Sequence, residues 1–203
     1  MIVADNSSTD NTAAIAAARG CRVVTVTQRM IGAARNGGAA IATAPILCFT
    51  DADMQIHPES FNAIERAAAD PRIVGGATGV TMERWSAGVA ATYALLVPFV
   101  WLTRMDTGVV FCRRNHFVSV GGYSEERHFG EDIDFLWKLT RLAWRRGQRL
   151  TRLRPYKAIA STRKFDRHGD WHYFTMMPLL LAGTIRPRAS GGRVARRYWY
   201  DDR

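Results

Sequence analysis

The stretch ILCFTDAD, residues 46–53, decides the fold class of this chain. The apolar run from Ile46 to Thr50 is typical of a buried strand, and two carboxylates, Asp51 and Asp53, follow at its end. Ligands of open α/β sheets bind outside the carboxyl ends of the strands. Oxygen ligands of this kind suit Mg²⁺ or Mn²⁺, which can in turn hold a diphosphate. The stretch therefore predicts a metal site at the edge of a sheet.

Strand and helix patterns alternate on both sides of this stretch. One helix is expected to end near Arg19, a second spans Gly32 to about Thr43, and a third starts at His57-Pro58-Glu59, with proline in its first position. Between these helices, β-branched and apolar runs predict strands at 2–5, 22–26, 46–50 and 73–80. This order predicts an α/β fold with a mostly parallel sheet flanked by helices.

The second half of the chain gives fewer signals. Residues 87–103 carry no charge and contain Pro98. Seventeen residues are marginal for a membrane span, so a buried or interfacial helix is predicted. A strand is expected at 107–112 and an amphipathic helix at 131–146, with acidic residues in its first turn. No sharp motif follows Gly147, and residues 186–203 are predicted to be a basic, flexible tail.

Two further groups of residues are suited to chemistry. Asp5 and Asn6 directly follow the first predicted strand, although part of the turn that they open is expected to cap the next helix. Glu131 and Asp132 begin the long helix after a glycine-rich turn. Such acids can simply balance the helix dipole. A carboxylate brought to the edge of a cleft could instead act as a general base toward a hydroxyl.

The composition constrains the partners. The 203 residues carry a net charge of +10, which favours an anionic partner such as a nucleotide diphosphate or lipid headgroups. A solvated basic face is an equally good interpretation. The three cysteines show no disulfide or metal-ligand spacing and no secretory signal is visible, so a reducing compartment is expected. We expect a cytoplasmic protein, with peripheral contact at the inner face of the membrane.

Three stretches together resemble the family 2 glycosyltransferases of the GT-A fold. They are VADNSSTDNT, AARNGGAAIATAPILCFTDADMQIHP and GVVFCRRNHFVSVGGYSEERHFGEDIDFLWKL, and they correspond to the family's DNGSTD turn, its ARNxG helix leading to a DAD motif, and its GG(F/Y)-to-ED segment. The resemblance covers roughly residues 2–146. It implies a Rossmann-like sheet that lacks the family's first strand and helix, so an N-terminally incomplete domain is expected, with the chain a fragment whose true start lies upstream.

The resemblance also implies roles by position. Asp5 and Asn6 would contact the base or ribose of a nucleotide-sugar donor, and Arg35 would lie near the nucleotide. Asp51 and Asp53 would bind Mn²⁺ or Mg²⁺ and the diphosphate, with Asp53 the most direct ligand. Asp132 would be the catalytic base of an inverting transfer to an acceptor hydroxyl, with Glu131 supporting it. The motifs do not define the acceptor. The uncharged stretch 87–103 points to a lipid-linked or membrane-near acceptor, and a polysaccharide stays open as the alternative.

The predicted organisation is one transferase domain over residues 1–185. Residues 1–82 would form its nucleotide-sugar and metal-binding half, and residues 83–185 its acceptor half. Four alternatives stay open: a truncated inactive remnant, a nucleotidyltransferase, a phosphohydrolase using the same Asp-x-Asp, and a basic surface binder without enzymatic activity. Nucleic acid is an improbable partner because no aromatic-interleaved basic module is present. His168 and His172 are weaker candidates for a late metal ligand.

Overall fold

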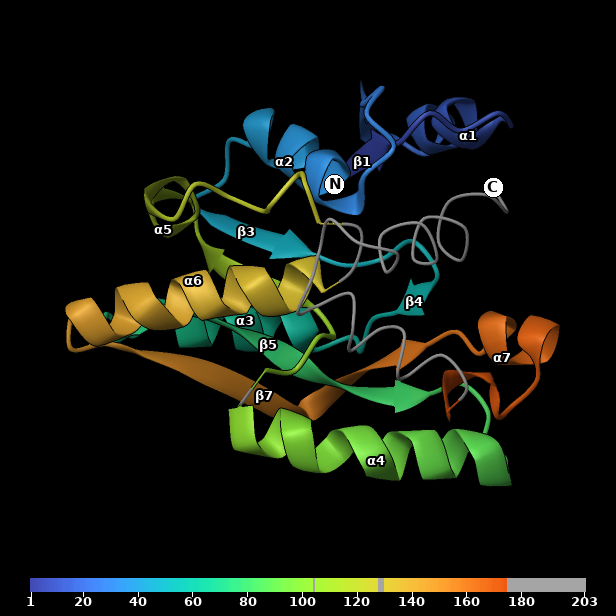
Figure 1. The fold of residues 1–203 in the computed structure, drawn as a ribbon. Coiled ribbons are helices and arrows are strands. Elements are labelled where there is room, and N and C mark those ends of the chain that lie inside the picture. Colours follow the sequence, from blue (N-terminus) through green and yellow to red (C-terminus); the bar gives the residue numbers. More distant parts are fainter. Residues whose placement is uncertain (104, 128–129, 175–203) are drawn as a thin grey trace. The chain divides into compact units, whose positions relative to one another are not determined.

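A computed structural model describes residues 1–103, 105–127 and 130–174, and the chain divides into two compact units. Among the described residues, the first unit comprises 1–44 and 121–135, and the second comprises 45–120 and 136–174. Figure 1 gives the elements in chain order.

The first unit is built on two parallel strands. β1 (Ile2–Asp5) pairs with β2 (Arg22–Thr25) along their full lengths, and the helices α1 (Thr12–Ala18) and α2 (Ile31–Ala40) follow them. Met30 and Ala33 form a small buried cluster, packed by Val26 and Ile31. These elements confirm the strands and helices expected for residues 1–44, to within a few residues at their ends.

The second unit contains a mixed five-stranded sheet. The order of the strands is β3 (Ile46–Phe49), β6 (Val110–Arg113), β5 (Ile73–Met82), β7 (Arg149–Ala160) and β4 (Met54–Gln55). Only β5 and β7 pair in parallel, and the other three pairings are antiparallel. β3, β5 and β7 run in one direction, but β6 lies between β3 and β5 and runs against both. The α/β class is confirmed, and the interposed strand makes the sheet less parallel in its pairings than the sequence order predicts.

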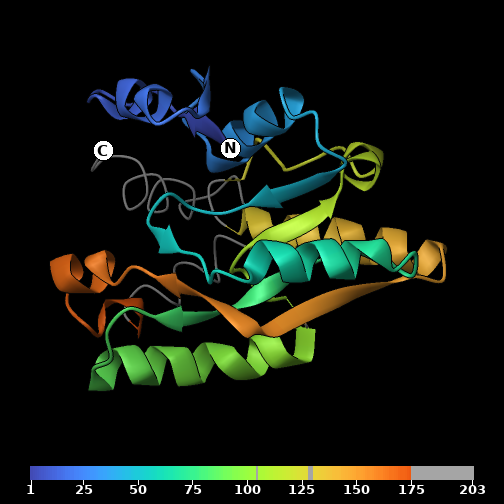
Figure 2. The ribbon, with the colours of Figure 1, turned by 180° about the vertical axis from the view of Figure 1, so that it is seen from behind.

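Helices cover this sheet on both faces. They are α3 (Ser60–Ala69), α4 (Ala87–Thr103), α5 (Arg114–Ser119), α7 (Arg163–His168) and the part of α6 (Glu131–Arg145) that belongs to this unit. Figure 1 and the reverse view of Figure 2 show α3 and α6 on opposite faces. Under α3, the side chains of Ile64, Val109 and Phe111 form a core in which none is more than 1% exposed.

The two longest strands are in close contact. A Cβ atom added at Gly76 of β5 would lie 2.0 Å from the carbonyl oxygen of Thr151 on β7. Because a side chain larger than hydrogen cannot fit there, glycine is required for this approach. β7 itself was not predicted, and neither were β4, α5 and α7. The alternation in β7 is hidden by its arginines, one of which, Arg152, pairs with the largely buried Asp106.

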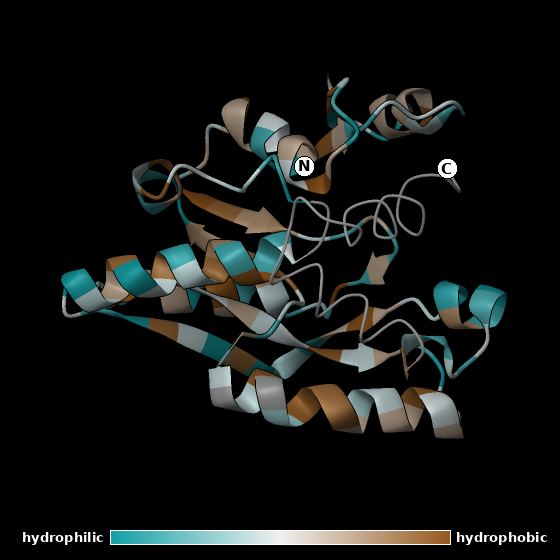
Figure 3. Cartoon of the chain, viewed as in Figure 1, coloured by the Kyte–Doolittle hydropathy of each residue, from teal (hydrophilic) through white to brown (hydrophobic). Residues whose placement is uncertain are grey.

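One predicted helix starts later than expected, and another matches its predicted range. The third helix begins at Ser60 rather than at Pro58, because the N–H of Glu59 donates to Nδ1 of His57 at 3.1 Å in a preceding turn. α4 matches the predicted range, and its first turns are buried at Val89 and Thr92. Farther along, Leu95 and Trp101 are 50% and 65% accessible, and Figure 3 shows strongly apolar residues in the middle of the helix.

In the described part of the chain, none of the helices is long and apolar enough to cross a bilayer. The tail expected at 186–203 lies outside the described residues. The predicted division of the domain into a donor half (residues 1–82) and an acceptor half (residues 83–185) stays a prediction. The two compact units have different boundaries, at 44/45, 120/121 and 135/136.

Candidate active site

In the first unit, Arg35 joins the two acidic residues that begin α6. Its Nη1 donates to Oε1 of Glu131 at 3.0 Å and to Oδ1 of Asp132 at 2.5 Å. The three side chains are 11%, 10% and 18% exposed, so the ion pairs are largely shielded from water. An isolated carboxylate is costly in such a position, and a charge-assisted hydrogen bond offsets that cost. Three residues predicted for the site are thus brought together.

Arg35 is itself held by the loop that leads to α6. Its guanidinium carbon lies 5.1 Å from the centre of the Tyr123 ring, and this ring stacks on Phe135 at 4.2 Å. The neighbouring Asn36 side chain accepts from the N–H of Tyr123 at 2.9 Å and donates to its carbonyl at 3.0 Å. The motif Arg35-Asn36 therefore ties α2 to residues 123–132. Tyr123 was not singled out from the sequence, although it lies inside one of the quoted motifs.

The chain reaches this geometry through glycines. Gly121, Gly122 and Gly130 have φ values of 74°, 64° and 71°, a region that side chains other than hydrogen rarely allow. In α2, a Cβ added at Gly32 would lie 2.2 Å from the carbonyl oxygen of Ser124. The glycine-rich turn thus places Glu131 and Asp132 beside α2.

Asp5 and Asn6 lie at the end of β1 and organise the loops next to it. Oδ1 of Asp5 accepts from the N–H of Ser8 at 3.2 Å. The side-chain amide of Asn6 donates to the carbonyls of Val26 and Gln28, at 3.2 and 2.6 Å. In the following turn, Asp10 accepts from both the N–H and the hydroxyl of Thr12, the first residue of α1, whereas the N-cap residue Asn11 makes no side-chain cap hydrogen bond. Contact of Asp5 and Asn6 with a nucleotide stays a prediction.

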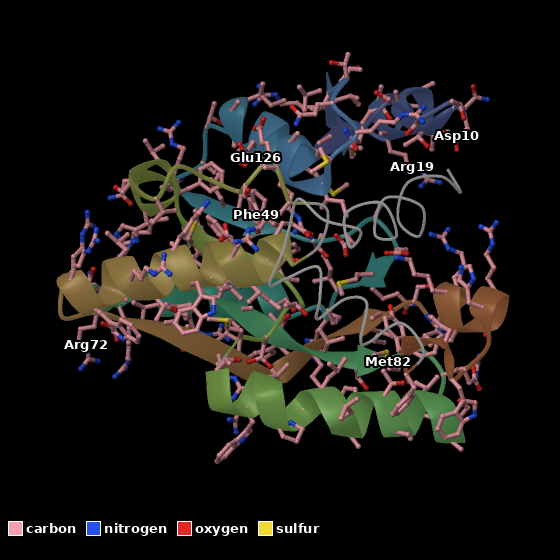
Figure 4. All side chains as sticks on the ribbon, viewed as in Figure 1. Asp10, Arg19, Phe49, Arg72, Met82 and Glu126 are labelled. Atoms are coloured by element: carbon pink, nitrogen blue, oxygen red, sulfur yellow. The ribbon has the colours of Figure 1, made fainter. Side chains whose placement is uncertain are left out.

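In the second unit, Asp51 and Asp53 follow β3 and are exposed. Phe49, labelled in Figure 4, ends that strand and stacks on Phe117 of α5 at 5.5 Å. Within the described ranges, no cluster of three or more His, Cys, Asp or Glu side chains could hold a metal ion. Two accessible carboxylates nevertheless fit Mg²⁺ or Mn²⁺, because such ions are usually bound through one or two carboxylates, retained waters and substrate phosphates.

A cationic side chain that sequence reasoning missed lies beside these carboxylates. Nη2 of Arg163 is 3.4 Å from Oδ2 of Asp53. The sequence signal is a basic pair, Arg163-Lys164, within the arginine-rich second half of the chain.

Of the two histidines proposed as late ligands, His172 is 8% exposed, packs on Phe165 and has Nδ1 2.6 Å from the carbonyl oxygen of Gly169. Burial lowers its pKa. These contacts give His172 a place in the packing around α7, and His168 is exposed.

The fold is that of the GT-A class of glycosyltransferases. Residues 1–178 match the family described as glycosyl transferase family 2, and the chain belongs to this family. Over 120 residues it is 28% identical to a pre-mycofactocin glycosyltransferase found in two strains of Mycobacterium tuberculosis. That match covers 53% of this chain but 26% of the relative, about a quarter of its length.

Solved structures share the fold. A mannosyltransferase from Pyrobaculum calidifontis, in complex with GDP-mannose and Mn²⁺, matches with a TM-score of 0.60 and 19% identity, over 78% of this chain and 46% of that one. Glucosyl-3-phosphoglycerate synthase from Mycobacterium tuberculosis, in complex with Mn²⁺, UDP-glucose and phosphoglyceric acid, matches with a TM-score of 0.57 and 23% identity, over 84% and 63% of the respective chains.

Proposed function

We propose that this chain carries the donor-binding and catalytic residues of a glycosyltransferase that moves a sugar from a nucleotide-diphosphate sugar to an acceptor hydroxyl, with inversion and with metal dependence. The observation that supports this most strongly is the Arg35 ion pair with Glu131 and Asp132 at the start of α6. It holds in place the acidic pair that the family resemblance marks as catalytic. Family membership and Mn²⁺-containing structures of the same fold are consistent with the proposal.

In this mechanism, Asp132 accepts the proton of the acceptor hydroxyl. The hydroxyl oxygen then forms a bond to the anomeric carbon of the sugar, and the bond from that carbon to the diphosphate oxygen breaks on the opposite side. Arg35, which also binds Glu131, would hold Asp132 in one orientation, as expected of a residue beside a general base. Asp5 and Asn6 would contact the base or ribose.

Asp51 and Asp53 would hold Mn²⁺ or Mg²⁺, which when bound supplies positive charge to the departing diphosphate. Both carboxylates are exposed and therefore accessible to solvent ions. The transferred sugar is proposed to be a hexose, because the similar structures contain GDP-mannose and UDP-glucose. The proposed acceptor is a hydroxyl of a lipid-linked sugar or of a polysaccharide. The nucleotidyltransferase and phosphohydrolase alternatives gain no support from the family match.

The decisive experiment measures binding before activity. UDP and GDP are titrated, each with and without Mn²⁺, into the wild-type chain, Asp53→Ala and Glu65→Ala. Glu65 is the matched control, an exposed carboxylate on α3 of the same unit. Wild type and Glu65→Ala should bind one nucleotide in a Mn²⁺-dependent manner, and Asp53→Ala should not. Undiminished affinity in Asp53→Ala would remove the metal assignment. Mn²⁺-dependent binding without turnover of any nucleotide sugar would favour the inactive remnant.

A membrane surface is proposed as a second partner because of α4. This helix carries no charged residue and exposes Leu95, Leu96, Val97 and Trp101. Tryptophan is enriched at bilayer interfaces, and a net charge of +10 complements anionic headgroups. We therefore propose that α4 contacts the surface of an anionic leaflet. We also propose that the protein is located in the cytoplasm. Contact of α4 with the membrane would suit an acceptor carried by a lipid.

A further inference from the structure

Arg163 is brought to Asp53 by backbone pairing within the second unit. β4 pairs with the end of β7 through Met54 opposite Ala160 and Gln55 opposite Ile159. Asp53 directly precedes β4, and Arg163 follows β7 by three positions. The contact of 3.4 Å between Nη2 of Arg163 and Oδ2 of Asp53 is therefore a product of strand register. It links residues 110 positions apart.

The base of Arg163 is fixed while its guanidinium is accessible. Oε2 of Glu83 accepts from the N–H of Thr162 at 3.4 Å, immediately before α7. Phe165 of α7 is 4% exposed. Arg84 donates to Asp166 of the same helix and to Asp170 just after it, each at 2.8 Å. The Arg163 side chain itself is 76% exposed. It can therefore change partner without disturbing the helix that carries it.

Arg163 and a divalent cation would compete for the carboxylate of Asp53. A divalent cation bound by Asp53 needs the carboxylate oxygens that Arg163 contacts, and an exposed ion pair is weak enough to be displaced. A guanidinium released next to this carboxylate is planar and permanently charged, and it can donate two parallel hydrogen bonds to phosphate oxygens. The diphosphate of the proposed donor would lie at this metal.

From this geometry we propose that Arg163 is a diphosphate-binding residue of the donor site, which exchanges Asp53 for the diphosphate when Asp53 takes the metal. The inference rests on the proposed function and adds to it a residue outside the three family motifs. It predicts opposite effects of one substitution on two ligands. Removing Arg163 should favour the metal alone and disfavour the nucleotide diphosphate.

The test compares Arg163→Gln with Arg167→Gln, which removes an exposed arginine from the same helix, and with Arg163→Lys. Free Mn²⁺ is followed by electron paramagnetic resonance, and UDP and GDP are titrated calorimetrically in the presence of Mn²⁺. In Arg163→Gln, affinity for Mn²⁺ alone should rise by up to about fivefold, and nucleotide affinity should fall about tenfold. Arg163→Lys should recover part of the nucleotide affinity, because it retains the charge.

The outcomes separate the inference from the function on which it rests. If wild type binds UDP or GDP with Mn²⁺ and Arg163→Gln binds it equally well, the inference is overturned while the proposed function stands. A drop in Mn²⁺ affinity in Arg163→Gln, or an equal nucleotide loss in Arg167→Gln, also overturns it. If wild type binds neither nucleotide, the proposed function fails first and the inference fails with it.

Discussion

Arg35 and Asp132 lie 97 positions apart in the chain, and their side chains meet at 2.5 Å between Nη1 and Oδ1. One residue belongs to α2 and the other to the first turn of α6. The resemblance assigns Arg35 to the nucleotide, whereas its contacts in the structure are with Glu131, Asp132 and the ring of Tyr123. This arrangement leads us to infer that Arg35 positions Asp132, the proposed general base. A nucleotide contact of Arg35 stays a prediction.

Replacing Asp132 by Asn tests the general base. The amide keeps the shape of the side chain but no longer accepts the acceptor's proton, so turnover should fall by about 10²–10⁴ while donor binding persists. The measurement is transfer from nucleotide sugars, together with calorimetry of the donor nucleotide. Glu131→Gln is the matched variant and should lose much less. If Asp132→Asn turns over at a near-normal rate, the base lies elsewhere, and Glu131 is the first residue to examine.

The positioning role of Arg35 should be visible in stability as well as in turnover. Arg35→Gln removes this cation from two largely buried carboxylates, and removing one partner of a buried pair costs about 3 kcal/mol of unfolding free energy. In an Asp132→Asn background the same substitution should cost less, because one of the charges is gone. Urea denaturation of the four proteins in this cycle measures the coupling. Strict additivity would show that the contact contributes nothing.

Two glycines in α2 predict opposite effects of the same substitution. Alanine is favoured over glycine inside a helix by up to about 1 kcal/mol. At Gly38, an added Cβ meets only side-chain atoms at 3.8 Å, so Gly38→Ala should raise the melting temperature. At Gly32, it would lie 2.2 Å from the Ser124 carbonyl oxygen, so Gly32→Ala should lower it and displace the loop that carries Tyr123. Equal shifts in the two variants would contradict this.

His116 should make the protein less stable in mild acid. It is 3% exposed, with Nδ1 2.9 Å from the carbonyl oxygen of Val74, and burial lowers its pKa below the ordinary 6.5. Above pH 6.5 both folded and unfolded chains hold it neutral, so it has no effect there. As the pH falls below 6.5, the unfolded chain takes up the proton first, which lowers the free energy of unfolding by up to about 1.4 kcal/mol per pH unit.

Urea unfolding of wild type and His116→Asn between about pH 7.5 and pH 5 measures this contribution. The variant should show a shallower loss of stability toward acid. Some slope should remain, because burial also lowers the pKa of His172. Parallel pH profiles of the two proteins would exclude His116 as a source of the acid sensitivity.

Peripheral membrane contact through α4 can be tested by flotation with vesicles. The wild-type chain should float with phosphatidylserine-containing vesicles and much less with phosphatidylcholine alone. Leu95→Ser and Trp101→Ser should weaken the association, while Phe61→Ser, at a residue of α3 that is 53% exposed, should not. Equal partition onto both kinds of vesicle, no partition, or the same loss in all three variants would count against this surface.

Local sequence alone determined the elements that lead into the site. The β-branched and apolar runs before Asp5 and Asp51, the glycine-rich turn and the acidic first turn of α6 are set by neighbours in the chain, so periodicity and turn chemistry predict them. The motifs in their order also identified the family. By contrast, β7 was not predicted. Its pairing with β5 and β4 determines which of its side chains are buried, and its arginines conceal the alternation of apolar and polar residues that is typical of a strand.

Tertiary structure decided which charges meet. The pairings of Arg35 with Asp132 and of Arg163 with Asp53 join residues about a hundred positions apart, and such contacts depend on helix packing and strand register that no local pattern encodes. The insertion of β6 between β3 and β5 is of the same kind, since hydrogen bonding between strands is indifferent to their distance in sequence. The sequence thus determines which residues are available for chemistry, and the packed chain determines which partner each of them has.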